Sequence, residues 1–440
     1  MSNQTLFDGA PTVPATPKPP RIGESRMLMP NRGQVEWRAI APESMVAVDH
    51  PVRAIVAFVS GLDLSKLRAK IQAKEGQPGR PAVDPAVLFA LWVFATTQGE
   101  ASAREVARLC GQHDAYRWIC GGIEVGAHTL ADFRSKRRVE FDDLLTQTIA
   151  LLLHKELADV KLTAQDGLRV RANAGTSSFR REKSLENCLK ESEAHLAALR
   201  ALEEDESTTE KKRAALVRAA QEQQARVLEA LHQLPRIEML KAKNRRKGED
   251  PAKNPARGST TDPDARFMKM PDGGVRPAFN VQIATDTKSQ AILGIAVTNE
   301  GTDRAQMQPM LEQIKQRTEK APEVHLVDGG FVSGAQIDAA TEGGTEVLAP
   351  VPKPRKATTD PHAPRKGDSE AVIEWRARMK TEESKETYKK RASTAERVNA
   401  VARKDGLTQF LVRGIEKVTS VCLLFAIAHN VLQSIRLGVT

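Results

Sequence analysis

The chain has 440 residues, a length that can hold two or three domains of ordinary size, each with its own core. Its 66 lysines and arginines exceed its 56 aspartates and glutamates, and the formal net charge of +10 favours a polyanionic partner without establishing one. We see no run of about 18 uncharged apolar residues, no signal-peptide core and no CxxC pair, so the sequence predicts a cytoplasmic protein without membrane contact, disulfide framework or zinc site.

The N-terminal third has the pattern of helices. Residues 1–40 are rich in proline and threonine and are expected to form a flexible tail. Over residues 41–157, apolar residues recur at spacings of three and four, as in DPAVLFALWVFATTQ. Asp84 has the place of a helix cap and Pro85 that of the first helical residue. We therefore expect an all-α domain over residues 41–157.

A basic segment follows the sequence HTLADF inside this helical region. Its cations are Arg134, Lys136, Arg137 and Arg138. One interpretation is a helix-turn-helix-like DNA reader, and the other is a solvated cationic helix face. The four cations are therefore candidate DNA contacts.

Two predicted strands carry an acid where their alternation calls for an apolar residue. In KLTAQDGLRVRA (residues 161–172), Asp166 has the parity of the apolar residues. In EVHLVDGGF (residues 323–331), Asp328 does the same, and two glycines follow it. The glycines allow a sharp turn and leave this acid at the lip of the sheet, where open α/β sheets place their chemistry.

A helical hairpin is expected between these two acids, over residues 183–234. Leucines at heptad-like spacing form a seam in each helix, Ser207 begins a capping box that ends at Glu210, and Pro235 is expected to follow the end of the second helix. Such a seam serves packing or dimer contact, so we assign it no chemistry. A basic loop over residues 236–260 follows.

The elements after the hairpin predict a mixed sheet. They are strands at 278–286 and 291–298, a helix at 303–317 capped by Asp303, the strand with Asp328, a helix at 333–341, a strand at 345–350, a mobile polar loop at 353–380 and a helix from Glu382. This order predicts an α/β domain over residues 158–440, interrupted by the hairpin and the basic loop, with helices on both faces of the sheet.

Carboxylates on neighbouring strands repel one another unless cations compensate. Hard oxygen ligands without His or Cys favour Mg²⁺ or Mn²⁺, and two such ions about 4 Å apart can activate a water or a 3′-hydroxyl in phosphodiester chemistry. A third acid is needed. Glu396 is the candidate, because it shares a helix face with small residues that allow close approach to the sheet. The alternative is an ion pair on the surface of its own helix.

Four other aspartates compete with these acids. Asp286 fits a turn and Asp303 a helix cap, whereas Asp262 and Asp264 lie in the TDPDAR loop, where a contact with substrate or ion stays open. His325 has the opposite parity to the second acid and is expected to point away from it.

Several segments resemble the insertion-sequence transposases that carry a DDE catalytic triad on an RNase H-like fold. In the order of that family they are QDGLRVRANAG, TDPDARFMK, FNVQIATDT, VTNEGTDRAQMQPMLEQI, LVDGGFVS, the YKKR and ERVNA segments, and LVRGIEKV followed by LLFAIAHNVL. The segments HPVRAIVAFVSGLDL, GRPAVDPAVLFALWVF and HTLADFR resemble its helical N-terminal domain. The resemblance covers nearly the whole chain after the tail.

This resemblance implies a role for each matching residue. Asp166, Asp328 and Glu396 become the first, second and third acids, which bind Mg²⁺ or Mn²⁺, as two ions. Tyr388 and Arg391 match the family's tyrosine and arginine, and the arginine would hold a phosphate or orient the glutamate. A lysine frequent after the family's glutamate has no clear match, and Arg403 is the candidate replacement.

The implied function is transposition of DNA. The enzyme would hydrolyse double-stranded DNA at the ends of its own element and join the freed 3′-hydroxyl to target DNA, as a homodimer or larger synaptic assembly that holds two ends. Residues 128–138 and 241–257 would bind phosphates. Two alternatives are a non-catalytic DNA-binding protein derived from a transposase and an RNase H-like nuclease that cuts without joining. Three retained, mutually repelling acids argue against the first.

Overall fold

A computed structural model describes residues 39, 41–74, 76, 80–201, 210–245, 250, 254–353 and 360–438. The predicted tail, the start of the capping box at Ser207 and parts of the basic and polar loops lie outside the described residues. The account that follows concerns the unit Pro42–Thr440.

A mixed β-sheet carries Asp166 in one strand, and Asp328 follows another of its strands by two residues. Its strands are β1 (Leu162–Arg171), β4 (Arg266–Lys269), β5 (Val275–Asp286), β6 (Ile292–Thr298), β7 (Val324–Leu326) and β8 (Glu346–Leu348). The order is β4-β5-β1-β7-β8, and β6 pairs with β5 beyond β4. β5 is antiparallel to β1, β4 and β6, whereas β7 is parallel to β1 and β8. The predicted α/β fold is confirmed, and the arrangement is consistent with an RNase H-like fold.

The helices before the sheet follow the predicted pattern. They are η1 (Pro42–Met45), α1 (Pro51–Ser60), α2 (Ser65–Ala69), α3 (Pro85–Thr97), α4 (Ala103–Gln112), α5 (Asp114–Cys120), α6 (Ala127–Ser135) and α7 (Arg138–His154). Asp84 accepts the N–H of Ala86 and Pro85 is the first residue of α3, so the predicted cap is confirmed.

The helices after β6 cover both faces of the sheet. They are α10 (Met307–Thr318), α11 (Gly334–Glu342), α12 (Glu370–Arg378), α13 (Glu382–Arg391), the π-helical turn η4 (Ala392–Glu396), α14 (Arg397–Lys404) and α15 (Ile415–Arg436). α10 packs where Gly294 leaves room for Met310, on the face opposite to Asp166. η4 and α14 approach the face of Asp166, to which Asn399 donates a hydrogen bond. The prediction of helices on both faces is confirmed.

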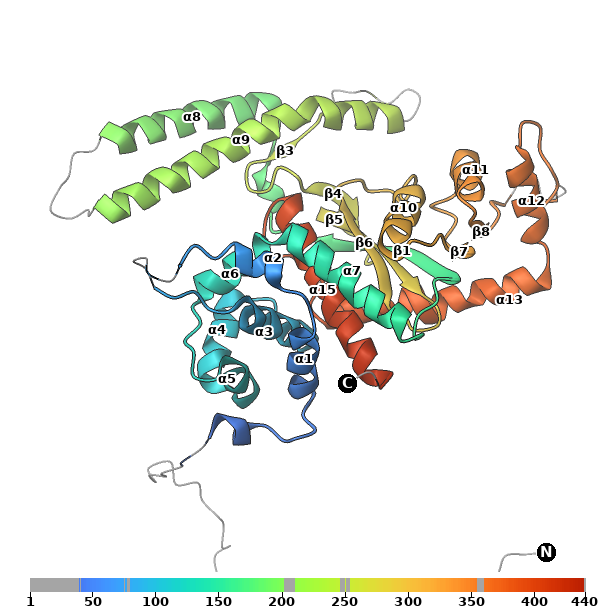
Figure 1. Cartoon of the computed structure of the whole chain (residues 1–440). Coiled ribbons are helices and arrows are strands. Elements are labelled where there is room, and N and C mark those ends of the chain that lie inside the picture. Colours follow the sequence, from blue (N-terminus) through green and yellow to red (C-terminus); the bar gives the residue numbers. More distant parts are fainter. Residues whose placement is uncertain are drawn as a thin grey trace, which may run out of the picture. The chain divides into compact units, whose positions relative to one another are not determined.

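The last helix, α15, joins the N-terminal helices to the sheet. It packs against α3, α6, α7 and β6 in one hydrophobic core (Figure 1). Asn430 on α15 accepts the N–H of Ile292 and donates to its carbonyl, at 2.7 and 2.9 Å. The helical segment and the sheet therefore share a core, and the domain boundary at residue 157 stays a prediction.

α15 is also long and apolar enough to cross a membrane by length and composition, but 78% of its apolar window is buried inside the protein. Serine, threonine, histidine, asparagine and glutamine interrupt this window, which is why it was not recognised in the sequence. Such burial is what a core helix requires.

The predicted hairpin is present as α8 (Glu182–Ala201) and α9 (Glu210–Asn244), side by side in Figure 1. Its seam closes on itself, because Leu185 packs with Val227, and Leu196 with Ala220. The prediction that Pro235 follows the helix end is wrong, since α9 continues to Asn244. Pro235 is exposed, so water can hydrate the carbonyl that lacks an N–H partner.

Three other elements differ from the expectations or extend them. α10 begins at Met307, and Asp303 does not cap it. The segment expected to be a loop contains α12, capped by Ser369. A short pair, β2 (Phe179–Arg180) and β3 (Gly258–Ser259), lies at the base of the hairpin beside the 3₁₀ turn η2 (Thr176–Ser178).

The TDPDAR loop caps the start of α15. Asp264 accepts the N–H of Ile415 at 2.9 Å, and Asp262 accepts the N–H of Gly414 at 3.2 Å. Asp262 is fully buried, and its second carboxylate oxygen has no hydrogen-bond partner within the described residues. Burial raises the pKa of Asp262 to about 6. Both aspartates therefore have a structural role, as caps of α15.

Asp262 makes stability depend on pH. Its folded pKa lies above the ordinary 3.8, so the folded protein binds this proton more tightly than the unfolded chain. The stabilisation is complete below about pH 4 and is lost as the pH rises through about 6, by up to about 3 kcal/mol. Asp262→Asn should remove this decline. Urea unfolding of both proteins between pH 4.5 and 7 measures it, and parallel profiles would contradict the assignment.

Candidate active site

Asp166 lies in the middle of β1, half-buried, on the face that η4 and α14 approach. One carboxylate oxygen accepts the N–H of Gly167 at 2.9 Å and lies 3.1 Å from the guanidinium of Arg391. The other accepts the side-chain amide of Asn399 at 2.9 Å. Three donors from two separate parts of the chain therefore hold this carboxylate in place.

The parallel pairing of β1 and β7 brings Asp328 within electrostatic range of Asp166. β1 and β7 are parallel, and Leu162 and Val324 are partners 162 positions apart, as are the two aspartates. β7 ends two residues before Asp328, where the chain turns and the carboxylate accepts the N–H of Gly330 at 2.7 Å. The predicted turn at the end of the strand is confirmed.

Glu396 reaches the site through a change of helix geometry. Residues five apart in an α-helix lie about 140° apart around the axis. The π-helical turn η4 widens the helix at this point, so that Arg391 and Glu396 lie on one side and their side chains form an ion pair of 2.8 Å. Arg391 thereby bridges Asp166 and Glu396.

The charges at this site perturb one another. Burial raises the pKa of Asp166, and the neighbouring charge of Asp328 adds to this, although Arg391 and the Gly167 N–H act to lower it. Burial opposes the charge of Arg391, but Asp166, Asp328 and Glu396 outweigh it and raise the arginine pKa. The guanidinium is therefore a permanent cation among three acids.

A chain of buried polar groups supports the opposite face of the sheet. His325 contacts the Thr163 hydroxyl at 2.7 Å and Gln165 at 3.1 Å, and burial lowers its pKa to about 3, so the ring is neutral. The ring lies on the face of β1 opposite to Asp166, whereas the prediction that it points away from the second acid, Asp328, stays a prediction. Gln165 donates to Gln282, which donates to Asp303.

Asp303 ends this chain of hydrogen bonds. Its carboxylate accepts Gln282 at 2.7 Å and Asn280 at 2.8 Å, and pairs with Arg169 at 2.9 Å. The sequence analysis missed this role. Two buried glutamines in adjacent strands, on the parity opposite to Asp166, were the available signal.

The side chains at the site fit a hard divalent cation by their chemistry. Asp166, Asp328 and Glu396 supply carboxylate oxygens, and the amide oxygen of Asn399 is buried without a hydrogen-bond partner in the described part of the chain. Within that part, no group of three His, Cys, Asp or Glu side chains is arranged to hold a metal ion. Arg391 lies between Asp166 and Glu396 instead.

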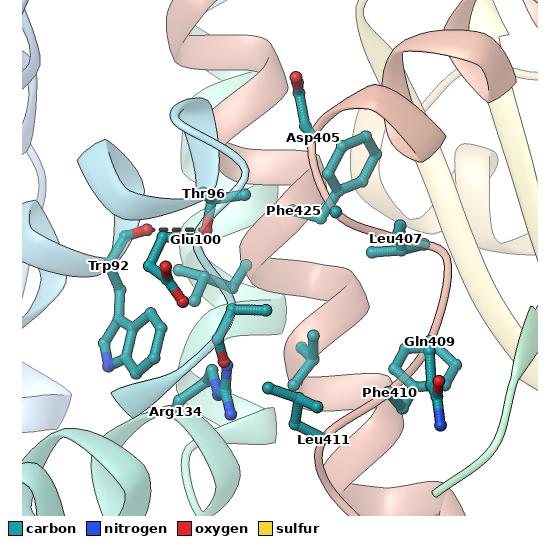
Figure 2. A pocket seen from close by; sticks show the side chains of 14 residues that line it. Trp92, Thr96, Glu100, Arg134, Asp405, Leu407, Gln409, Phe410, Leu411 and Phe425 are labelled. Carbon is teal, nitrogen blue, oxygen red and sulfur yellow. Dashed lines mark hydrogen bonds between the residues drawn. The ribbon is translucent and has the colours of Figure 1, made fainter. Parts of the chain in front are cut away.

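The predicted DNA contacts differ in accessibility. Arg134 is 6% exposed, lies 4.4 Å from the Trp92 ring and donates to the carbonyl of Ala101. Figure 2 shows it beside a cavity of about 40 Å³ that Trp92 and Phe410 also line. Burial lowers its pKa to about 10. Because Arg134 is buried, its guanidinium is not accessible to DNA.

The other cations of the basic segment lie at the junction of α6 and α7. Lys136 and Arg138 are exposed and pair with Asp132 and Glu416 at 2.8 Å, and Arg137 is partly buried. They do not form the single basic helix end that the sequence suggested, because α7 begins at Arg138.

The DNA contacts implied by the resemblance also differ in their exposure to solvent. Arg403 is exposed on α14. Tyr388 is half-buried on α13, packs against the second core beside β7 and β8, and lies within electrostatic range of Asp328 and Arg391.

A cationic groove of about 630 Å³ lies at the base of the hairpin. Lys241, Arg245, Arg257 and Arg266 line it with one acid, Glu300. Its apolar wall includes the rings of Phe179 and Phe267, whose centroids are 4.4 Å apart. Phe267 is exposed and Phe179 is buried, and a net positive groove with one exposed aromatic ring suits a nucleic-acid strand.

Comparison with protein families gives two matches. A family model described as "Transposase DDE domain" matches residues 352–435, which include Arg391, Glu396 and Asn399. A model described as "Transposase domain (DUF772)" matches residues 41–136, which hold most of the N-terminal helices. Comparison with curated proteins and with solved structures gives no match.

Gly167→Ala should disturb the site from the opposite face. A Cβ at this position would overlap the Asp303 carboxylate and lie 2.9 Å from the Gln282 amide. We expect a loss of about 1–3 kcal/mol in the free energy of unfolding. Gly301→Ala is the control, because its Cβ would meet its nearest neighbour at 3.8 Å. Equal urea midpoints for the two variants would contradict this role of Gly167.

Proposed function

The chain belongs to the insertion-sequence DDE transposase family, and from this premise we propose that it cuts DNA at the ends of its own element and joins the 3′ ends to a target. The family implies DNA as the substrate. The observation that carries the proposal is the convergence of Asp166 and Glu396 on one guanidinium, with Asp328 within electrostatic range of Asp166 and of that guanidinium.

In this proposal, Asp166, Asp328 and Glu396 hold two ions of Mg²⁺ or Mn²⁺. The chemistry that the bound ions supply is activation of a water or a 3′-hydroxyl and stabilisation of the leaving oxygen. Asn399 holds Asp166 in one orientation through its hydrogen bond. Tyr388 and Arg391 face the same acids, and the guanidinium of Arg391 is suited to a phosphate of the cleaved strand.

In this proposal DNA also contacts cations outside the site. Lys136 and Arg138 are exposed after α6, and Arg403 is exposed on α14. The groove at the base of the hairpin adds four further cations. Contacts of this kind bind phosphates and give affinity without sequence information. Because two ends must be held together, we propose a homodimer or a larger assembly.

Asp166→Asn and Asp328→Asn should each abolish strand cleavage and leave DNA binding intact or tighter. Each change removes a cation ligand and a negative charge, whereas binding relies on cations elsewhere. The assay uses a duplex with the DNA that flanks the coding sequence, in Mg²⁺ or Mn²⁺. Wild-type cleavage rates in either variant would exclude this site. Wild-type cleavage without joining would favour the nuclease alternative, and binding without cleavage the non-catalytic one.

Glu396→Gln should abolish cleavage in the same assay, because it removes the third acid. Glu386→Gln is the matched control on the neighbouring helix. Glu386 is exposed and pairs with Lys389, so its loss should change stability by only a few tenths of a kcal/mol and leave cleavage unchanged. Equal activity of the two variants would show that Glu396, whose side chain is 54% exposed, serves only as the ion-pair partner of Arg391.

A further inference from the structure

We propose that Arg391 makes cation binding depend on bound DNA. In the absence of DNA its guanidinium occupies the position between Asp166 and Glu396, and a DNA phosphate draws it away before these acids hold a divalent cation. This inference rests on the proposed function, because it takes the same acids as ligands.

Arg391 forms ion pairs with two of the acids that would bind a cation. One guanidinium nitrogen lies 3.1 Å from Asp166 and another 2.8 Å from Glu396. The second oxygen of Asp166 accepts Asn399. The Arg391 and Asp166 side chains are 11% and 20% exposed, so solvent weakens this half of the bridge less than it weakens a surface pair. Glu396 is 54% exposed, so its half of the bridge is more open to solvent. A cation that binds both acids must displace it.

Electrostatics explains why the bridge forms and what can release it. Three acids lie within electrostatic range of the Arg391 guanidinium, and its positive charge offsets their repulsion. A divalent cation can replace the guanidinium there, but the displaced charge would remain partly buried without a partner, which is unfavourable. A phosphodiester removes this penalty, because its oxygens match the guanidinium fork in two parallel hydrogen bonds.

The helix offers a route for this exchange. Arg391 and Glu396 lie on one side only because η4 is π-helical. Relaxation of this turn to α-helical geometry would place them about 140° apart around the axis and break the bridge. Arg391 could then reach a phosphate while Glu396 stays free to bind a cation.

The proposal predicts cooperative binding. If a DNA phosphate removes a competitor of the cation, DNA tightens cation binding, and the cation tightens DNA binding by the same factor. Removal of the guanidinium should therefore strengthen cation binding without DNA and weaken the cooperativity.

The experiment measures Mn²⁺ binding to the full chain by electron paramagnetic resonance, with and without a duplex of the flanking DNA. We expect wild-type protein to bind Mn²⁺ at least tenfold more tightly with DNA. Arg391→Gln should bind Mn²⁺ at least tenfold more tightly than wild type without DNA and gain little from DNA. Titrations of Asp166→Asn correct for ions held elsewhere, including those held by the DNA.

Arg397→Gln is the matched control, because it removes the same charge from the same helical segment. Arg397 is exposed and donates to Gln290, so its loss should leave Mn²⁺ binding and its coupling to DNA unchanged. Arg391→Lys serves if the glutamine variant unfolds. Lysine keeps the charge but lacks the fork that bridges two acids, so coupling should be reduced.

Equal Mn²⁺ affinity of wild type with and without DNA would overturn the proposal, as would unchanged affinity in Arg391→Gln. Either result would leave the proposed function standing if Asp166→Asn still lacks cleavage. Loss of the function itself would appear differently, as normal cleavage by Asp166→Asn.

Discussion

A charged carboxylate in the middle of a β-strand is the constraint on which the site depends. On the face of β1 where Asp166 lies, the neighbouring side chains are apolar. Burial among them disfavours the charged form of Asp166. Arg391, Asn399 and the Gly167 N–H compensate for this. The helix that supplies the first two must approach the sheet closely, and the π-helical turn within it aligns the side chains.

The two faces of the sheet carry different polar groups. Glu396 and Asn399 come to the face of Asp166, whereas hydrogen bonds between uncharged groups run from Thr163 to Gln282 on the other and end on Asp303. These hydrogen bonds tie β1 to β5 and β7, the strands whose register fixes where Asp166 and Asp328 lie. A buried polar network that satisfies its members specifies one alignment, because a shift of one residue would leave each group unpaired.

Local patterns in the sequence predicted the strands and their acids, because alternation in β1 is visible over a few residues. The turn role of Asp286 followed in the same way, and it accepts both the N–H and the hydroxyl of Ser289. Contacts between distant segments were not predictable. The burial of Arg134 depends on Trp92, and the role of Asp303 depends on three residues of β1 and β5. α9 continues beyond Pro235 because this proline is exposed to solvent, and the sequence around a proline does not show whether it is exposed.

The place of α15 has a consequence for how the protein is made. This helix fills the core between the N-terminal helices and β6, yet it follows every other described helix in the sequence. Until it emerges, the apolar surfaces of α3, α7 and β6 lack their shared partner, and the nascent chain exposes them. A product that stops before Ile415 would carry every acid of the site and still lack the helix that closes the core. The order of the chain therefore places the acids of the site ahead of the helix that closes this core.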